Sequence, residues 1–405
     1  MKDFLTGQLL VHSDTDHPFA LISLDLNKFK QVNDTFGHAT GDELLAEVSA
    51  RLKKCVQSGD LVSRQGGDEF IVLLDNIDGT HSVDIICRKI INEISIPYHI
   101  HGIEVSIGVS IGVALSPIQG SNPSDLLRFA DLALYHAKKS GRSTWVYYRS
   151  DMSEHLAQRR NMELELRTAI CDDQLFLCYQ PRFNVKDNKI DAVEALVRWH
   201  HPVRGILTPD QFIPLAEESG LIINLSDWVL NRACEEVMQY SETISVSVNI
   251  SAMEFQSSNF AERVQNIMKR RCFPAERLEI EVTESVVLTD PERTYAAMKI
   301  LKELGVRFLI DDFGTGYASL SYLHNFKFDG IKLDKSFTKT LEKNADSKKI
   351  IESIIDLGKA YSLEVTAEGV ENAEQLAFLQ AHHCDVVQGY FIGKPVNISE
   401  LKIEN

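Results

Sequence analysis

Asp311 and Asp312 stand side by side at the end of the apolar run 306–310, and Phe313 and Gly314 follow directly. Neighbouring side chains of a strand point to opposite faces, but where a strand gives way to a Gly-rich loop both carboxylates can turn toward one cavity. Paired carboxylates at such a place suit a divalent metal ion. The same residues also suit a helix N-cap or a plain turn, so this stretch alone leaves the alternatives open.

Similar polar side chains recur through the second half of the chain, at or just beyond the ends of β-rich runs. They are Glu194, Asn249, Glu281, Lys332, Glu368 and Gln388. Most successive members are separated by about one strand plus one helix, so each strand returns its side chain to the same rim. Carboxylate and amide oxygens are the ligands that Mg²⁺ and Mn²⁺ prefer. The recurrence therefore favours a metal site over a turn or cap.

The β-rich runs predict the scaffold that would position these side chains. They lie at 177–181, 193–199, 244–250, 278–283, 306–311, 330–333, 365–367 and 386–391. Eight such runs with helical stretches between them predict an α/β fold, a TIM-like (β/α)₈ barrel. Only about a dozen residues separate the first two runs, too few for a crossover helix, so one antiparallel strand is expected. Thr208, Pro209 and Gly220 supply start and stop signals for one helix.

Composition narrows the possible partners. The 405 residues suggest two domains. With 58 Asp and Glu against 42 Lys and Arg, the net charge of −16 argues against a nucleic-acid polymer as partner. A small anion remains compatible where local cations or metal ions hold it. Seven scattered cysteines without a Cys-x-x-Cys pair predict reduced thiols.

The chain contains no apolar run of about 18 residues, and its first residues lack the blocks of a signal peptide. We therefore expect a soluble, cytoplasmic chain without a membrane segment of its own. An upstream sensor or membrane region ahead of Met1 is left open.

Apolar side chains at spacings of three or four predict an amphipathic helix between 151 and 170. They are Met152, Leu156, Met162, Leu166 and Ile170. Because this stretch has no Gly-, Pro- or Ser-rich linker, it reads as a stiff joint or as the first helix of the second domain, and both can hold. The predicted division is a first domain at 1–150, a helical linker at 151–164 and a second domain at 165–405.

The second half resembles the EAL-domain cyclic di-GMP phosphodiesterases. The resemblance runs from roughly Leu164 to Val396 and rests on Glu194-Ala195-Leu196 with Val197-Arg198-Trp199, Asn249-Ile250-Ser251, Glu281-Val282-Thr283-Glu284, Asp311–Gly316, Lys332-Leu333-Asp334, Glu368-Gly369-Val370-Glu371 and Gln388-Gly389-Tyr390. It implies hydrolysis of one phosphodiester bond of cyclic di-GMP to linear pGpG. Two Mg²⁺ or Mn²⁺ ions per site would serve that chemistry.

The resemblance also implies roles for single residues. Those matching the metal ligands are Glu194, Asn249, Glu281, Asp311, Asp312 and Glu368. The catalytic residues would be Lys332, Glu368, Asp312 and Glu194. Lys332 would orient the attacking water or stabilise charge, and Glu368 would act as a metal ligand, with proton acceptor as its alternative role. Gln180, Arg198 and Gln388 would contact guanine or phosphate. Glu284, Phe313, Gly314, Thr315 and Gly316 would support and shape the site from a loop.

A second constellation lies in the first 150 residues. Asp25 ends an apolar run, and Gly66-Gly67-Asp68-Glu69 lies between the β-rich runs 61–63 and 70–74. A Gly-Gly pair at a hairpin tip is a common turn. With Asp25 and the following acidic pair it can also present backbone and carboxylates to a nucleotide with Mg²⁺. Lys138 and Arg142 could then meet the phosphates.

This part resembles the GGDEF diguanylate cyclase domain over roughly Lys2 to Tyr148, which implies an α+β fold with a central antiparallel sheet. By that resemblance metal binding and 3′-hydroxyl activation fall to Asp25, the Leu26 carbonyl, Asp68 and Glu69. The residues expected at GTP are Asn33, Asp42, Phe29, Lys30, Gly66, Gly67, Lys138 and Arg142.

The first domain also departs from the cyclase pattern. Gln8-Leu9-Leu10 replaces the usual Asn-Arg, and the short distance from Asp3 to Asp25 leaves little room for a first helix. Gln57 stands where the inhibitory-site arginine is usual, although Asp60 is kept. Cyclase chemistry further needs two such domains facing each other, so a homodimer is expected from the resemblance alone. The sequence therefore predicts a phosphodiesterase with a GTP-binding regulatory domain. A bifunctional cyclase and hydrolase, or a non-catalytic cyclic di-GMP receptor, is the alternative.

Overall fold

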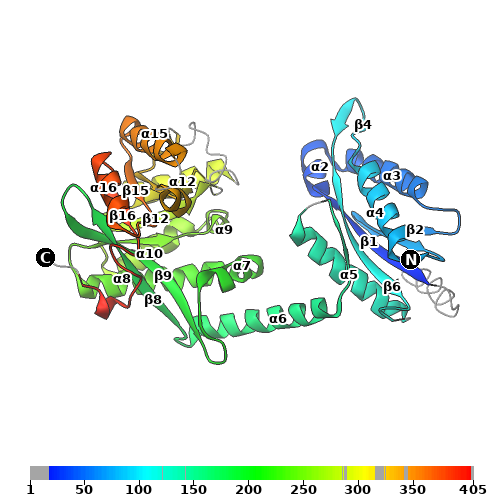
Figure 1. Ribbon diagram of the computed structural model, residues 1–405, viewed down its shortest axis with the longest axis horizontal. Helices are drawn as coiled ribbons and strands as arrows, with labels where there is room; N and C mark the ends of the chain where they lie inside the picture. Colours follow the sequence, from blue (N-terminus) through cyan, green and yellow to red (C-terminus); the bar gives the residue numbers. More distant parts are fainter. Residues whose placement is uncertain are drawn as a thin grey trace. The chain divides into compact units, whose positions relative to one another are not determined.

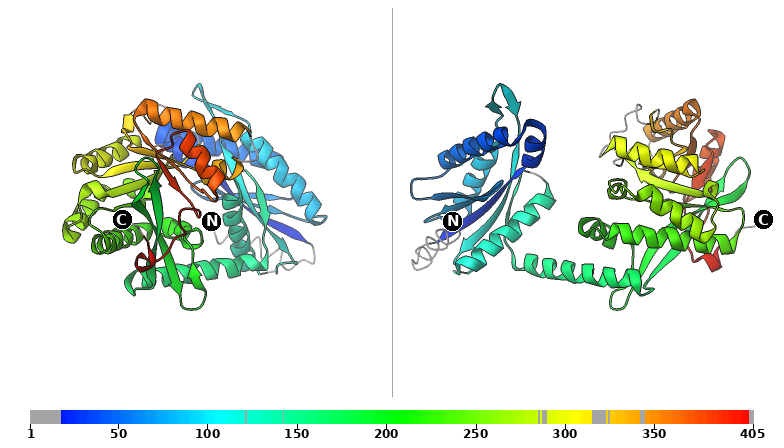
Figure 2. Two further views of the ribbon diagram at one scale, coloured as in Figure 1. Left: turned by 60° about the vertical axis from the view of Figure 1, so that its left-hand side comes forward. Right: turned by 180° about the vertical axis from the view of Figure 1, so that it is seen from behind.

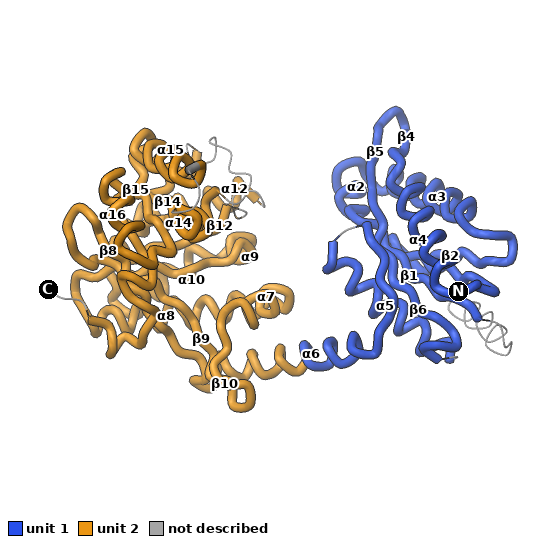
Figure 3. The backbone as a smooth tube through the Cα atoms, viewed as in Figure 1, with its two compact units in different colours: residues 1–160 blue, residues 161–405 orange. Residues whose placement is uncertain are grey.

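A computed structural model describes residues 18–120, 122–141, 143–284, 286, 290–314, 323, 325–341 and 345–402. The chain divides into two compact units, residues 1–160 and 161–405, which Figure 3 colours separately. The division falls inside helix α6 (Ser150–Cys171), which confirms the helix predicted between 151 and 170. Among the described helices, none is both long enough and apolar enough to cross a bilayer.

Unit 1 is built on a five-stranded sheet with the order β2-β3-β1-β6-β7. The strands are β1 (Phe19–Asn27), β2 (Leu61–Gly66), β3 (Glu69–Leu74), β6 (Gly108–Ser116) and β7 (Trp145–Tyr147). β1 pairs antiparallel with β3 and β6, whereas β7 joins β6 in parallel. The central antiparallel sheet is therefore confirmed, with one parallel edge strand added.

Helices cover both faces of this sheet, as Figures 1 and 2 show. They are α2 (Phe29–Phe36), α3 (His38–Cys55), α4 (Gly79–Ser95) and α5 (Pro123–Ser140), and a small hairpin of β4 (Tyr98–Ile100) and β5 (Ile103–Val105) completes the unit. Because side chains alternate along β1, Ile22 and Leu24 pack against α3 and α4, whereas Phe19 and Leu21 pack against α5. Asp25 continues the α5-facing set.

Unit 2 contains the barrel. Its strands are β8 (Leu175–Asn184), β9 (Lys189–His201), β11 (Ser245–Asn249), β12 (Leu278–Thr283), β13 (Arg307–Phe313), β14 (Gly330–Leu333), β15 (Glu364–Ala367) and β16 (Val386–Gln388). Pairing of β8 with both β9 and β16 closes the ring, and both pairings are antiparallel. The barrel with one antiparallel strand is therefore confirmed. A short strand β10 (Gly205–Leu207) pairs antiparallel with the end of β9.

Helices follow the barrel strands. They are α7 (Pro209–Ser219), α8 (Ile222–Tyr240), α9 (Ala252–Phe255), α10 (Phe260–Arg271), α12 (Pro291–Glu303), α14 (Lys335–Thr340), α15 (Ala345–Tyr361) and α16 (Ala373–Ala381), with short 3₁₀ turns at Ala275–Arg277 and Ile398–Glu400. The predicted signals of α7 are confirmed. Gln211 Oε1 accepts from the Thr208 amide at 2.9 Å, Pro209 is the first helical residue, and Gly220 ends the helix at φ 74°.

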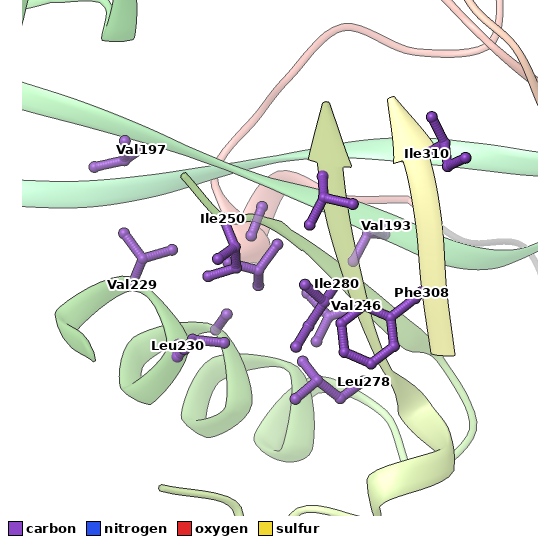
Figure 4. Close-up of a cluster of buried hydrophobic side chains, with 14 of the residues drawn as sticks. Val193, Val197, Val229, Leu230, Val246, Ile250, Leu278, Ile280, Phe308 and Ile310 are labelled. Carbon is purple, nitrogen blue, oxygen red and sulfur yellow. The ribbon is translucent and has the colours of Figure 1, made fainter. Parts of the chain in front are cut away.

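The alternation along β12 explains how the barrel directs its polar residues. Leu278 and Ile280 are fully buried in the layer between strands and helices, where Val229 and Leu230 of α8 join them (Figure 4). The intervening residues, Glu279 and Glu281, must then point into the barrel, at two successive levels. Glu281 belongs to the rim at the carboxyl ends of the strands, and Glu279 lies one level below.

The lower level holds a closed ring of four buried or half-buried charges. Arg182 donates to Glu279 and, at 3.0 Å, to Glu364. Arg307 donates to the same two carboxylates, at 2.6 and 3.0 Å. Although burial alone would lower it, the carboxylates of Glu279 and Glu364 hold the pKa of Arg182 above its ordinary value. The two positive and two negative charges of this ring balance each other, so the layer of the barrel below the site carries no net charge.

Candidate active site

The buried ammonium of Lys332 is the centre of the polar cluster at the rim. This side chain, on β14, is 1% exposed. Its Nζ lies 2.7 Å from Glu281 and Glu368, 3.3 Å from Glu194 and 3.5 Å from Asp311. The four carboxylates come from β9, β12, β13 and the residue after β15. The structure thus brings together five residues that the sequence placed at one rim.

Amide side chains orient Glu194. Asn249 Nδ2 donates to one of its oxygens at 2.8 Å, and Gln388 Nε2 donates to the other at 2.6 Å. The same Gln388 nitrogen lies 3.1 Å from Gln180 Oε1. Within the described part of the chain, Glu281 Oε1 and Gln388 Oε1 are buried without a hydrogen-bond donor. Two buried acceptors therefore have capacity for a ligand.

A β-bulge in β13 explains how Asp311 and Asp312, although consecutive, both lie at the same rim. The pairing of β13 with β14 shifts register between Ile310 and Phe313, and Asp312 has a φ of 53°. Aspartate tolerates this left-handed conformation better than most residues. Asp311 faces Lys332 and accepts from the Asp312 amide at 3.0 Å, while Asp312 stays exposed beside it. Both residues belong to β13 rather than to a helix cap.

The carboxylates crowd one another, and their pKa values reflect this. Burial and the neighbouring Glu194 raise the pKa of Glu281 well above its usual range. Burial raises the pKa of Glu368 to about 7, against the pull of Lys332. Burial alone would raise the pKa of Glu194, but Lys332 and the two amides hold it below its ordinary value. One ammonium therefore does not neutralise all the acids around it, and the cluster can accept further positive charge.

Loops behind the rim fix its shape. Glu284 Oε1 accepts from the Gly314 amide at 2.9 Å, and Phe313 is buried, whereas Thr315 and Gly316 lie outside the described residues. A Cβ on Gly389 would lie 2.1 Å from the carbonyl oxygen of Val370. Only glycine permits this close approach, which holds the segment after β16 against the segment after β15.

A cavity of about 310 Å³ opens over the cluster. It is lined by the expected Gln180, Glu194, Asp311, Glu368 and Gln388, and also by Leu196, Lys335, Lys339, Gly369, Glu371, Gly389 and Tyr390. Sequence reasoning did not select this second group as site residues. Glu371 lies three residues after Glu368, and Lys335 follows Lys332 into the next helix, so proximity to a selected residue was the available signal.

A neighbouring cavity of about 440 Å³ is mainly apolar and lies among β9, β11, α7 and α8. It reaches Asn249 and Glu281, so it adjoins the polar cluster. Arg198 lines neither cavity. Its guanidinium donates to the Val197 carbonyl of its own strand at 2.8 Å, so the structure does not bring this expected substrate contact to the others.

The donor set suits a hard cation chemically, because it consists of carboxylate and amide oxygens, one of them the buried and unpartnered Glu281 Oε1. Across the described residues, however, no three His, Cys, Asp or Glu side chains stand in an arrangement ready to hold a metal ion. The ammonium of Lys332 lies between the acids instead.

In unit 1 the predicted metal residues meet at the edge where β1, β3 and α5 come together. Asp25 is directly opposite Glu69 in the sheet, and the Leu26 amide approaches the Asp68 carbonyl at 3.4 Å. Lys138 of α5 forms an ion pair with Asp25 at 2.6 Å. Burial raises the pKa of Asp25, and Lys138 opposes that rise.

Most of the residues expected to contact GTP come from α2, α3 and the hairpin between β2 and β3. Asn33 Oδ1 is buried without a donor from the residues that the structure describes, and a Cβ on Gly41 would lie 1.9 Å from it, so glycine provides the space for this amide. Phe29 is buried, whereas Lys30 and Asp42 are exposed. The hairpin tip between β2 and β3 contains the exposed Gly66 and Gly67, the latter at φ 54°. Arg142 lies outside the described residues.

The departures from the cyclase pattern are only partly visible. The stretch from Asp3 to Leu10 lies outside the described residues. Asp60 accepts from the Gln57 amide at 2.7 Å and from the Asp75 amide at 3.0 Å. In this chain, therefore, Asp60 holds a turn together.

Family profiles decide the identity of the two units. The EAL domain profile matches residues 163–395, and the diguanylate cyclase GGDEF domain profile matches residues 1–144. This chain belongs to the EAL domain family, with a GGDEF domain ahead of the EAL domain. The barrel described above is the EAL domain, and the rim cluster lies within it.

Curated relatives match nearly the whole chain. MucR of Pseudomonas aeruginosa, a bifunctional diguanylate cyclase and cyclic di-GMP phosphodiesterase, is 37% identical over 390 residues, which is 95% of this chain and 57% of MucR. The cyclic di-GMP phosphodiesterase PdeR of Escherichia coli is 35% identical over 399 residues, 98% of this chain and 60% of PdeR. The chain thus spans about half the length of the curated relatives it matches.

Solved EAL structures show the same barrel. The PaMucR phosphodiesterase in complex with c-di-GMP is 36% identical, with a TM-score of 0.58, and the match covers 60% of this chain and all of that one. An EAL domain protein of Listeria monocytogenes is 32% identical, with a TM-score of 0.54, over 58% of this chain and 94% of that one.

Proposed function

We propose that the EAL domain hydrolyses one phosphodiester bond of cyclic di-GMP to give linear pGpG. One observation carries the proposal: four carboxylates from four places on the barrel surround a single buried ammonium, at the floor of a cavity of about 310 Å³. Two relatives that match 95% and 98% of this chain are named cyclic di-GMP phosphodiesterases.

The proposal includes two Mg²⁺ or Mn²⁺ ions per site. The residues that would hold them are Glu194, Asn249, Glu281, Asp311, Asp312 and Glu368. When bound, the ions would supply an activated water and positive charge for the phosphate oxygens.

The chain's own side chains have separable roles in this proposal. Lys332 carries three N–H donors beside the carboxylates that line the cavity, so it can orient the attacking water or stabilise negative charge on the phosphate. Asn249 and Gln388 hold Glu194 in one orientation by their amide donors. Gln180 and Gln388, at the cavity wall, offer amide groups that can pair with a guanine edge or a phosphate.

Product analysis tests the function. The purified chain, incubated with cyclic di-GMP and Mg²⁺ or Mn²⁺, should convert it to pGpG, and prior removal of divalent cations by a chelator should stop conversion until the metal is restored. Tight binding without any product would instead identify a receptor. Neither binding nor product would remove cyclic di-GMP as the ligand.

We further propose that the GGDEF domain binds GTP with Mg²⁺ and regulates the EAL domain. Two observations support this proposal: Asn33 Oδ1 is buried without a donor among the described residues, and Lys138 forms an ion pair with Asp25. Pairing of two chains belongs to the same proposal, because cyclase chemistry would need two GTP-loaded domains facing each other. Synthesis of cyclic di-GMP is the alternative function of this domain.

Addition of GTP should raise the rate of cyclic di-GMP hydrolysis severalfold without GTP being consumed at a comparable rate. An Asn33→Ala variant should lose this stimulation and keep the basal rate, since Asn33 lies in unit 1. Chromatography with ultraviolet detection separates GTP, cyclic di-GMP and pGpG, and so gives both rates in one assay. Formation of cyclic di-GMP at a rate comparable with its hydrolysis would establish the bifunctional alternative.

A further inference from the structure

The wall of the smaller cavity combines many acids with two cations. Glu194, Asp311, Glu368 and Glu371 contribute carboxylates, whereas Lys335 and Lys339 are the cationic members of its lining. Lys332, deeper down, already faces four carboxylates. A substrate with two phosphodiester groups brings two negative charges into this acidic cavity.

Both lysines stand on the first helix after β14. Lys335 is the first residue of α14 and Lys339 follows four positions later, so the two side chains share one face of the helix. Asp334 caps this helix by accepting from the Ser336 amide at 3.0 Å. The strand that places Lys332 in the barrel thus also places a pair of exposed ammonium groups at its rim.

The position of Lys335 relative to the cluster is fixed by close packing. A Cβ on Gly369 would lie 2.6 Å from Lys335 Cβ and 3.2 Å from its Cα, and Gly369 itself has a φ of 70°. Glycine therefore lets the segment directly after Glu368 lie against the start of α14. This contact fixes the position of Lys335 at the rim relative to Glu368 at the floor of the cavity.

We propose that Lys335 and Lys339 bind the phosphodiester group of the substrate that is not cleaved. This inference rests on the proposed hydrolysis of cyclic di-GMP and assigns positioning residues for it. With the second phosphate held at the rim, the first is directed to the carboxylate cluster at the floor. Two flexible exposed cations also attract a dianion into an otherwise acidic cavity, and that attraction weakens as salt is added.

Kinetics of the full-length chain test the lysines. The double variant Lys335→Gln/Lys339→Gln should raise KM for cyclic di-GMP about tenfold, with kcat changed less than about twofold, because the lost contacts are present before and during the reaction. Its KM should also respond more weakly to NaCl between low and physiological ionic strength than the wild-type KM does. The double variant to arginine keeps both charges and should restore KM and its salt dependence.

The matched control is Lys349→Gln, which removes an exposed lysine on α15 that lines neither cavity. It should leave KM and the salt response unchanged. An unchanged KM and salt response in the Lys335→Gln/Lys339→Gln variant, or an equal effect of Lys349→Gln, would overturn the inference.

Equilibrium binding of cyclic di-GMP, measured by calorimetry on the same variants, separates the two proposals. If the wild type binds cyclic di-GMP without hydrolysing it, the proposed function fails. Even then, a tenfold loss of affinity confined to the Lys335→Gln/Lys339→Gln variant supports the role of the two lysines. Equal affinities of this variant and the wild type contradict that role.

Discussion

Replacement of Asp312 by asparagine should leave the EAL domain folded and reduce the hydrolysis of cyclic di-GMP by about 100-fold or more. Asparagine adopts the left-handed conformation that this position requires at φ 53°, so the bulge in β13 survives the change. The variant loses only the negative charge and one strong oxygen ligand. Turnover under saturating Mg²⁺ or Mn²⁺, with folding checked by circular dichroism, measures the effect.

The control is Asp356→Asn, the same change at a carboxylate that is 78% exposed on α15 and lines neither cavity. It should keep wild-type turnover. If Asp312→Asn also kept full turnover, the role of a metal ligand would be wrong for Asp312.

Replacement of Arg182 by methionine should destabilise the barrel by about 3–5 kcal/mol. The guanidinium is 1% exposed and pairs with Glu279, whose side chain is equally buried, so its loss leaves an uncompensated carboxylate inside the barrel. Arg307 remains as a partner of Glu279 but is only two-thirds covered, and it cannot satisfy both oxygens alone. Urea denaturation followed by tryptophan fluorescence measures the change, because Trp199 and Trp228 report from unit 2.

Two further variants test the reason for this loss. Adding Glu279→Gln to Arg182→Met removes the stranded charge and should recover part of the lost stability. Lys189→Met breaks an exposed pair with Asp187 at 3.9 Å and should cost less than about 1 kcal/mol. A loss of similar size in Lys189→Met and Arg182→Met would contradict the importance of burial.

The fold could be predicted because its signals are local. Alternation in Leu278-Glu279-Ile280-Glu281 shows a strand with an apolar outer face and a polar inner face, and the short connection between the first two runs dictates an antiparallel pair. The capping signals around α7 work in the same way. Each depends on residues that are close in sequence, so no knowledge of distant contacts is needed.

The site could be predicted only in part, because its remaining features depend on packing. The position of Lys332 on β14 follows from the recurrence of strands, but its contact with four carboxylates does not. Lys335 reaches the cavity because Gly369 lets two backbones approach, which no spacing rule reveals. Arg198 shows the opposite case, since it belongs to a well-matched motif and yet its side chain donates to its own strand.

The central claim, that water attacks a phosphodiester bond in this cavity, is tested most directly by hydrolysis of cyclic di-GMP in ¹⁸O-labelled water. Mass spectrometry of the product should show pGpG with a single ¹⁸O in its terminal 5′ phosphate, and the Asp312→Asn variant should form very little of it under the same conditions. Recovery of unchanged, unlabelled cyclic di-GMP from the wild-type chain with Mg²⁺ or Mn²⁺ present would contradict the account.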